Sequence, residues 1–370
     1  MNPKVGIIYL TYPTPNWERD ITRFMASLEK IAYPKDRLEL ICVESKAKID
    51  PIKGWFHDRY MRKSGNELPR IHYIDNDEWI GFSGNNNLGV EKAKELRCDY
   101  VHLTNEDTDI DPDYITKAVE RAESDTSIAI VQSLLLLGEE RDKINSSGNE
   151  YHYLGFGYSR DYTSPLAPLL LKERGAGRGG DIGYASGAGM LVRMSAIERM
   201  GKIFDERFFS YHEDTDASLM ARCLGMRVVV EPSSVIYHYY EFGKSKKNFF
   251  WMERNRYVLV FSYYRLWTLL LLWPMLAVMD AALLLFSVKN GWWREKLDVY
   301  REWFTPAYWA WIRERRRRIQ RSRVIGDREL LKLAVSEIAF QGEGIKNPLL
   351  EKIGNPMMRV YWAVVRRMII

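Results

Sequence analysis

The first two thirds of the chain alternate short apolar runs with amphipathic stretches. Apolar runs rich in β-branched residues lie at residues 5–12, 38–44, 70–74, 100–103 and 128–136. Runs of this length between polar turns predict buried strands. Residues 16–31, 89–97 and 112–124 have a helical apolar pattern, which places helices between the strands. This β-α-β-α-β order predicts an α/β fold with a mostly parallel, doubly wound sheet flanked by helices.

The pattern changes near residue 266. Residues 266–288 read LWTLLLLWPMLAVMDAALLLFSV, an apolar stretch just long enough to cross the hydrocarbon core of a bilayer. Pro274 would kink or break a spanning helix, and Asp280 is costly near mid-bilayer unless it is buried. A re-entrant or interfacial hairpin explains both residues better than a simple span, although both stay open. Tryptophans that suit a headgroup region gather around the stretch: Trp267, Trp273, Trp292, Trp293, Trp303, Trp309 and Trp311.

Charge is distributed unevenly along the chain. Lys and Arg number 54 against 49 Asp and Glu overall, but 19 against 10 from residue 261 to the end. A basic tail beside an apolar segment predicts binding to membrane lipids through residues 266–370, and no nucleic-acid partner. The run RERRRRIQRSR at 313–323 would lie at an anionic leaflet; the alternative is an ordinary solvated helix face. Apolar area on the tail could also contact a second copy of the chain, so a homo-oligomer stays open.

Composition excludes several classes of protein. With 46% apolar and 13% aromatic residues, the chain is neither disordered nor collagen-like. Its three cysteines have no CxxC spacing, which argues against a disulfide framework or a zinc site, and no export signal is visible at the N-terminus. We therefore divide the chain into an α/β catalytic domain, residues 1–245, and a helical, basic, membrane-associated region, residues 246–370.

Polar segments follow four of the predicted strands: TYPTP, ESK, GFSGNNNLG and TNEDTDIDPD. Because parallel strands end at the same edge of a sheet, these segments are expected to converge on one crevice. GFSGNNNLG, residues 81–89, ends a long loop and opens a helix, where free N–H groups favour an anion; the alternative is a simple helix-capping turn. The spacing matches neither a dinucleotide fingerprint nor a P-loop. The glycine-rich segment 172–181 is either a mobile lid or a plain surface loop.

Two acidic clusters carry the candidate chemistry. Asp107 in TNED follows an apolar strand, and hard cations such as Mg²⁺ or Mn²⁺ bridge such carboxylates to substrate phosphates. Glu213 and Asp214 precede a predicted helix, where adjacent carboxylates raise one another's pKa and suit a general base. His238 ends the strand RVVVEPSSVIYH and could return to the crevice as a ligand, although an isolated histidine is more often structural.

Taken together, these motifs resemble a known family. TYPTP, VESK, GFSGNNNLG, TNED, SGAGMLVRMSAIERMGKIFDERFFSYHEDTD, VIYH and ERNR occur in an order similar to that of inverting family 2 glycosyltransferases, close to the rhamnosyltransferase-like bacterial branch. The resemblance covers residues 3–260 and implies a GT-A fold, a Rossmann-like and mostly parallel sheet. The tail is similar to the membrane-associated tails found in part of that family.

The resemblance assigns the donor and metal residues. Asn105, Glu106 and Asp107 stand at the Asp-x-Asp motif, with Asp107 as the ligand of a divalent metal, Mn²⁺ or Mg²⁺, and Asn105 departing from the usual aspartate. His238 matches the third position of the metal site. The positions implied to hold the donor nucleotide are these: Thr11, Tyr12, Glu44, Asn87, Asn105 and Glu106.

The resemblance also assigns the reaction. Asp214 matches the catalytic base and Glu213 a neighbour that orients the acceptor. The implied enzyme is a metal-dependent inverting glycosyltransferase that moves a sugar from a nucleotide-diphosphate sugar to a hydroxyl of a glycan or lipid-linked acceptor, on the cytoplasmic face of a cell inner membrane. A nucleotidyltransferase, or a non-catalytic membrane protein that binds a sugar nucleotide or a polyanion, is the alternative.

Overall fold

The computed structural model describes residues 2–45, 52–166, 180–239, 248–339 and 348–370. The chain divides into two compact units. Unit 1 comprises Met1–Asn149, Ser159–Phe209 and Met226–Tyr240, and unit 2 comprises Glu150–Tyr158, Ser210–Gly225 and Glu241–Ile370. The domain boundary predicted at residue 245 falls outside the described residues and stays a prediction.

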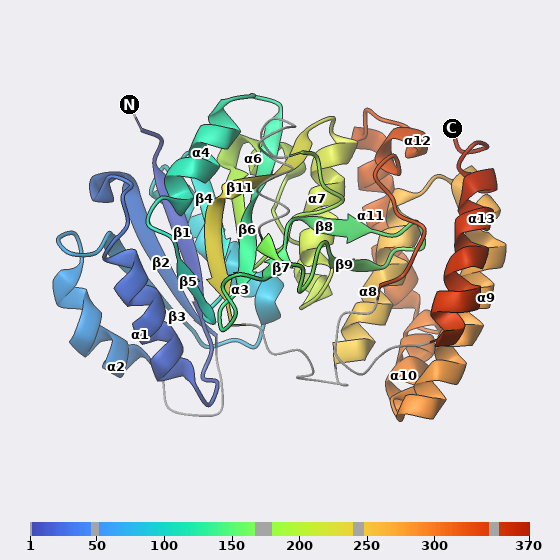
Figure 1. Ribbon diagram of the computed structural model, residues 1–370, viewed down its shortest axis with the longest axis horizontal. Coiled ribbons are helices and arrows are strands. Elements are labelled where there is room, and N and C mark those ends of the chain that lie inside the picture. Colours follow the sequence, from blue (N-terminus) through green and yellow to red (C-terminus); the bar gives the residue numbers. More distant parts are fainter. Residues whose placement is uncertain (1, 46–51, 167–179, 240–247, 340–347) are drawn as a thin grey trace. The chain divides into compact units, whose positions relative to one another are not determined.

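Unit 1 contains a nine-stranded sheet with the order β3-β2-β1-β4-β10-β6-β11-β5, and β7 pairs with β6 (Figure 1). Strands β1, β2, β3, β4, β6 and β11 run parallel, whereas β10, β5 and β7 are antiparallel to their neighbours. The strands are β1 Val5–Thr11, β2 Leu38–Ser45, β3 Arg70–Asn76, β4 Tyr100–Thr104, β5 Thr108–Ile110, β6 Ile128–Leu137, β7 Ile144–Ser146, β10 Gly189–Arg193 and β11 Arg227–His238.

Helices cover both faces of this sheet. They are α1 Trp17–Leu28, α2 Ile52–Tyr60, α3 Gly81–Glu95, α4 Tyr114–Glu123 and α6 Met194–Met200, with 3₁₀ turns at Lys35–Arg37, Met61–Lys63 and Glu206–Phe208. On one face, the Tyr9 ring stacks on Phe24 of α1 at 4.0 Å. On the other face, α3 approaches so closely that a Cβ at Gly89 would lie 2.6 Å from Ile8. Strand β1 is therefore buried on both sides, as its continuous apolar run predicts.

The predicted strands and their parallel order are confirmed, with ends that shift by a residue or two. The Gly/Asn-rich segment, however, is not the end of a loop, because α3 is already helical from Gly81. Buried side chains stabilise its first turns: Asn85 donates to the carbonyl of Gly81 at 2.8 Å, and Asn86 donates to that of Phe82 at 3.0 Å. Tertiary burial thus overrides the poor helix propensity of glycine and asparagine.

Unit 2 is mainly helical. Its helices are α7 Glu213–Cys223, α8 Asn248–Tyr263, α9 Leu266–Asn290, α10 Trp293–Trp303, α11 Pro306–Ser322, α12 Asp327–Leu330 and α13 Asn355–Val365, with a π-helical turn at Leu350–Gly354. A small ribbon of β8 Asn149–Tyr151 and β9 Gly157–Ser159 has its inner residues in this unit. The helical C-terminal region predicted from the sequence is confirmed.

The apolar stretch does not form a hairpin. Helix α9 runs for 25 residues and continues through Pro274, so the hairpin interpretation is wrong. Contacts hold the helix on both sides of the proline: Tyr361 donates to the carbonyl of Leu271, and Lys296 pairs with Asp280. Among the described residues, α9 is the one helix long and apolar enough to cross a membrane, and 22% of its most apolar window is buried.

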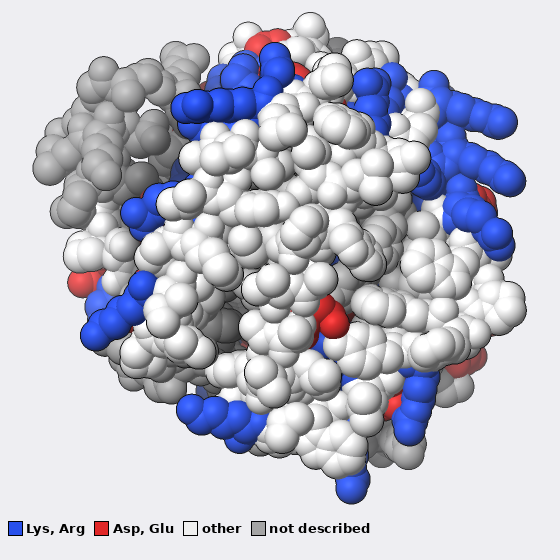
Figure 2. Space-filling view, turned by 90° about the vertical axis from the view of Figure 1, so that its right-hand side faces the viewer, with Lys and Arg blue, Asp and Glu red and all other residues white. Residues whose placement is uncertain are grey.

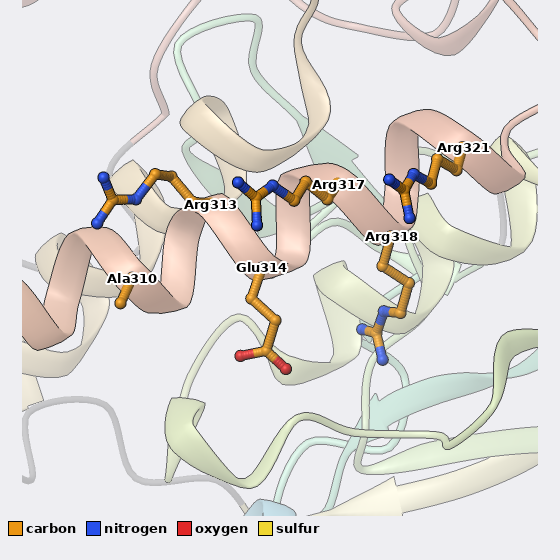
Figure 3. A pocket seen from close by; sticks show the side chains of 6 residues that line it. All are labelled: Ala310, Arg313, Glu314, Arg317, Arg318 and Arg321. Atoms are coloured by element: carbon orange, nitrogen blue, oxygen red, sulfur yellow. The ribbon is translucent and has the colours of Figure 1, made fainter.

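The arginine-rich run of α11 is divided between two roles. Arg315 pairs with Asp216, and Arg316 donates to the carbonyls of Phe261 and Tyr264, so these two are structural. The exposed members line a groove of about 700 Å³, in which Glu314 and Arg318 project to the opposite side of the helix from Arg313, Arg317 and Arg321 (Figure 3). The residues of this groove are Ala310, Arg313, Glu314, Arg317, Arg318 and Arg321. Binding of the exposed arginines to an anionic leaflet stays a prediction.

Candidate active site

The carboxyl ends of β1, β2, β4 and β11 lie at one edge of the sheet in unit 1. This follows from the strand pairing. Strand β1 is parallel to β2 and β4. Strand β10 is antiparallel to both β4 and β6, and β11 is parallel to β6, so β11 runs in the same direction as β4. Thr11, Glu44, Asp107 and His238 belong to or directly follow these strand ends. The sequence-based prediction that polar segments converge there is confirmed for these segments.

Asp107 and His238 form the centre of this edge. His238 Nε2 lies 3.2 Å from Asp107 Oδ1, and the other ring nitrogen, Nδ1, lies 3.1 Å from Oδ1 of Asn145. The backbone N–H of Tyr239 donates to the carbonyl of Asp107 at 2.8 Å, which ties the β11 end to the loop after β4. The imidazole and the carboxylate are thus fixed side by side, and Asn145 orients the ring as metal-site partners do.

The residues before Asp107 belong to the same turn. The Oδ1 atom of Asn105 is buried and has no hydrogen-bond partner among the described residues. Glu106 contributes its backbone carbonyl, which accepts from the Tyr9 hydroxyl at 3.2 Å. In the described part of the chain, no group of three or more His, Cys, Asp and Glu side chains could hold a metal. A carboxylate and an imidazole still fit Mg²⁺ or Mn²⁺, which take further ligands from phosphates and water.

An aromatic surface lies beside the end of β1. The Tyr12 ring is 6.0 Å from that of Trp79, which in turn is 5.7 Å from Phe209. Trp79 is 58% exposed, a large fraction for an indole. By contrast, Thr11 is fully buried and its hydroxyl points to the carbonyl of Val43. Flat exposed rings of this kind can stack on a nucleobase or a sugar.

Glu44 is held from two sides. Its Oε1 accepts from the backbone N–H of Ile52 at 2.7 Å, and its Oε2 accepts from the Tyr73 hydroxyl at 2.6 Å. The side chain is 6% exposed. Each carboxylate oxygen can accept a further hydrogen bond, so contact with a ribose stays a prediction.

Asn87 links α3 to the segment after α6. Its amide donates to the carbonyl of Phe204 at 3.0 Å and to Oε1 of Glu206 at 2.9 Å. Its neighbour Asn85 joins a different network, in which its amide donates to the Ser45 hydroxyl and its oxygen accepts from Asn76. The structure places Asn87 in the framework of the site, and its contact with a donor stays a prediction.

Glu213 and Asp214 lie in unit 2, at the start of α7. The backbone turn before them is strained, because Tyr211 and His212 have φ values of 68° and 67°. Asn255 of α8 holds this turn, since its amide donates to the carbonyl of Ser210 at 3.0 Å and to that of Tyr211 at 2.8 Å. Strain of this type clusters at functional sites, where a scaffold fixes an otherwise unfavourable conformation.

The two carboxyl groups differ in environment. Glu213 is buried, and its Oε2 has no hydrogen-bond partner in the described part of the chain. Burial and the adjacent Asp214 raise the pKa of Glu213 well above that of an ordinary glutamate. Asp214 is half-buried, and its Oδ1 accepts from the backbone N–H of Thr215 at 2.6 Å. Burial lowers the pKa of His212 to about 4, so this imidazole is neutral at pH 7.

Sequence reasoning missed several of these residues. Trp79 and Tyr73 carry no motif, and only their place after or within a strand signals them. Asn145 contacts His238 from 93 positions away. Asn255 lies in the ERNR motif, but the sequence does not reveal that its amide supports the turn before Glu213. The segment 172–181, interpreted as a lid or a loop, lies largely outside the described residues.

Comparisons with known proteins show what the chain resembles. The low-salt glycan biosynthesis hexosyltransferase Agl10 of Haloferax volcanii is 29% identical over 223 residues, which are 59% of this chain and 61% of that protein. A crystal structure of GalNAc-T7 with UDP, GalNAc and Mn²⁺ superposes with a TM-score of 0.56 and 14% identity, covering 71% of this chain and 48% of GalNAc-T7. The chain thus spans less than two thirds of either protein.

These likenesses establish the fold and the family. The superposition on GalNAc-T7 confirms the predicted GT-A fold. The model of the family described as glycosyl transferase family 2 matches residues 11–201, which is more than half of the chain. The matched segment includes Tyr12, Glu44 and Asp107 and ends before α7. The chain therefore belongs to glycosyl transferase family 2.

Proposed function

We propose that the protein is a metal-dependent inverting glycosyltransferase that moves a sugar from a nucleotide-diphosphate sugar to a hydroxyl of a glycan or lipid-linked acceptor. The observation that carries the proposal is the Asp107–His238 pair, at 3.2 Å, together with Asn105, two positions before Asp107, whose buried Oδ1 has no hydrogen-bond partner in the described part of the chain. Family membership supports the reaction class, and the UDP and Mn²⁺ in GalNAc-T7 support the donor and the cofactor.

In this proposal, Asp107 and His238 would hold the divalent metal, which would bind the donor diphosphate. Bound there, Mn²⁺ or Mg²⁺ supplies positive charge that stabilises the departing nucleoside diphosphate. Asn145 keeps the His238 ring in its ligating orientation through Nδ1. Tyr12 and Trp79 provide the exposed rings on which the base or the sugar stacks.

Asp214 acts as the general base in the proposal. It takes the proton of the acceptor hydroxyl while the oxygen attacks the anomeric carbon on the face opposite the leaving diphosphate, which inverts the configuration. The raised pKa of Glu213 favours its protonated form over that of an ordinary glutamate, so the proposal assigns the role of proton acceptor to Asp214 and not to Glu213. A protonated Glu213 can donate a hydrogen bond that orients the acceptor.

A donor screen tests the proposal. Purified protein is incubated with UDP-, GDP- and dTDP-sugars, each with Mn²⁺, Mg²⁺ or EDTA, and nucleoside diphosphate release is measured with and without membrane-lipid extract as acceptor source. We expect one donor to release its nucleoside diphosphate, and we expect EDTA to abolish that release. Release of pyrophosphate instead would indicate a nucleotidyltransferase. Binding of no donor under any condition would contradict the proposal.

The Asp214→Asn variant separates donor binding from sugar transfer. We expect loss of transfer by at least about a hundredfold with donor affinity unchanged, because the variant loses the proton acceptor and keeps the phosphate site. Asp113→Asn, an exposed aspartate before α4, serves as the matched control. Unchanged turnover in Asp214→Asn would remove Asp214 from the mechanism.

We also propose that the enzyme works on the cytoplasmic face of the membrane, where nucleotide sugars are made.

A further inference from the structure

Helices α9 and α13 expose an unusually apolar surface in unit 2. Leu285 is 72% exposed and Val360 is 67% exposed. We name this surface the α9/α13 face; its large exposed side chains are Leu266, Trp267, Leu270, Trp273, Val278, Leu285, Val288, Met357, Val360, Val364, Met368 and Ile370. Figure 2 shows mostly uncharged residues on this side of the molecule, with one acidic patch near the middle. A contiguous apolar surface of this extent marks a binding surface for a protein or a membrane.

The two helices form one antiparallel pair. The indole N–H of Trp267, at the start of α9, donates to the carbonyl of Met368 at 3.0 Å, and Tyr361 donates to the carbonyl of Leu271. At 1.5 Å per residue, α9 is roughly 38 Å long. The α9/α13 face is therefore a slab two helices wide, which is broader than a groove for a single peptide helix.

The opposite side of α9 is fixed by a half-buried aspartate and a buried lysine. Asp280 is the one charged residue between Leu266 and Val288, and it turns inward. Its carboxylate accepts from Lys296 Nζ at 2.6 Å, from the Tyr300 hydroxyl at 2.6 Å and from the Tyr257 hydroxyl.

The same lysine connects α9 to α8. Lys296 is fully buried and also contacts Glu253 at 2.6 Å, and Glu253 pairs with Arg256 through both carboxylate oxygens. If α9 left this cluster to cross a bilayer, Asp280 would enter hydrocarbon and Lys296 would lose one of its partners. The apolar side of α9 is thus available to lipid while the helix stays packed on α8 and α10.

Basic residues border the face. Arg265 and Lys289 lie exposed at the two ends of α9, and Arg359, Arg366 and Arg367 lie exposed on α13 and just after it. Residues 355–370 contain no acidic side chain. Figure 2 shows Lys and Arg side chains around the margin of the uncharged area. This charge suits anionic headgroups, and it disfavours a face-to-face pair of two copies, which would bring the same arginines together.

From these observations we infer that the α9/α13 face docks on the surface of an anionic bilayer, with both helices in the plane of the interface and neither crossing it. Trp267 and Trp273 lie at headgroup depth, where indole rings are favoured. The apolar side chains enter the boundary of the acyl region, as in other interfacial helices. The inference stands on unit 2 alone and does not depend on the proposed function.

Vesicle flotation tests the docking. The full chain is mixed with vesicles of phosphatidylcholine and phosphatidylglycerol, or of phosphatidylcholine alone. We expect flotation with the anionic vesicles that weakens with salt. Leu285→Glu combined with Val360→Glu should weaken binding roughly tenfold or more, because each change puts a charge where lipid lies. Val324→Glu, at a residue 70% exposed outside the face, is the matched control and should bind normally.

Two further readouts decide the mode of contact. Arg265→Cys and Lys289→Cys place a thiol at either end of α9, and an impermeant maleimide added outside the vesicles should label both. Protection of one end until detergent is added would mean a spanning helix and overturn the inference. Equal flotation of the Leu285/Val360 variant and the parent would overturn it as well. So would vesicle-independent dimers in analytical ultracentrifugation that the same variant dissociates, because a second copy would then cover the face.

Discussion

The amide of Asn255 donates to two successive backbone carbonyls, those of Ser210 and Tyr211. The two residues before Glu213, Tyr211 and His212, have positive φ values, a conformation that costs an L-amino acid about 1–3 kcal/mol per residue. One side chain thus offsets local strain and fixes the direction in which α7 begins. At the residue scale, the proposed base depends on a positioning residue in another helix.

Asn255→Ala should therefore lower kcat by roughly 10- to 100-fold while the KM for the donor stays unchanged, because the carboxylates move and the donor site in unit 1 does not. Steady-state kinetics with the donor identified by the screen measure both constants. Asn66→Ala, at an exposed asparagine, is the matched control. A rise in donor KM at constant kcat would argue against a positioning role for Asn255.

Glu213 should make the parent protein less stable as pH rises. Its pKa is raised in the folded state, so the folded protein binds the proton more tightly than the unfolded chain, whose glutamate titrates near 4.5. Stability from this group is complete below pH 4.5 and is lost as pH rises through the raised pKa.

Glu213→Gln removes that loss. Its advantage over the parent in the free energy of unfolding should widen by up to about 1.4 kcal/mol per pH unit until the raised pKa is passed. Chemical denaturation over a pH series that starts at 4.5 and rises measures the difference. Glu198→Gln, at an exposed glutamate, should show no such trend. A difference that is flat with pH would contradict the raised pKa.

At the scale of elements, buried polar clusters decide how the helices of unit 2 are arranged. Glu253 of α8, Asp280 of α9 and Lys296 of α10 meet in one cluster, with Arg256 and Tyr300 completing its hydrogen bonds. Burial alone would raise the pKa of Glu253, but Arg256 and Lys296 outweigh it and hold that pKa at about 2. An apolar contact could slide by a turn, whereas these paired charges specify one register for three helices.

Lys296→Met should destabilise the protein by about 3–5 kcal/mol, because it leaves the buried Glu253 and the half-buried Asp280 together with one cation fewer. Urea denaturation followed by tryptophan fluorescence reports the change, since Trp303 packs against Tyr257 and Tyr300, which both donate to Asp280 of this cluster. The matched control, Lys332→Met, removes an exposed lysine and should change stability by less than about 0.5 kcal/mol. Equal midpoints for the two variants would mean that the cluster contributes little.

At the scale of the whole molecule, the proposal assigns donor binding to unit 1 and proton removal to unit 2. Thr11, Glu44, Asp107 and His238 come from the sheet of unit 1, whereas Asp214 begins a helix of unit 2. The family match covers residues 11–201 and ends before α7. A substitution at the proposed site in unit 1 should therefore impair donor binding, and one in unit 2 should impair proton removal without changing donor binding.

Asp107→Ala should weaken donor binding in the presence of Mn²⁺ by roughly 10- to 100-fold, and EDTA should weaken binding to the parent in the same way while leaving the variant unchanged. Isothermal titration with the donor, with and without metal, measures both effects. Asp99→Ala, a change at the start of β4 away from the site, is the control. Equal donor affinity of the parent with and without metal would exclude the metal from donor binding.

The amino-acid sequence by itself determined the strands, their parallel order and the motifs that meet at the edge of the sheet. Buried parallel strands need continuous apolar runs, and polar residues that follow such runs must lie at the strand ends. A run such as residues 5–12 therefore predicts both its own burial and the place of Tyr12. Local spacing also suffices to place Glu213 and Asp214 at the start of a helix.

Only the tertiary structure decided which distant groups meet. The contact between His238 and Asn145, the support of the turn at Tyr211 by Asn255, and the inward position of Asp280 each join residues far apart in the chain. Periodicity could not reveal that α3 is helical from Gly81 or that α9 continues through Pro274, because long-range contacts outweigh local propensity there. Local preferences amount to about 1 kcal/mol per glycine and about 3 per proline, and the packing of a whole helix exceeds both.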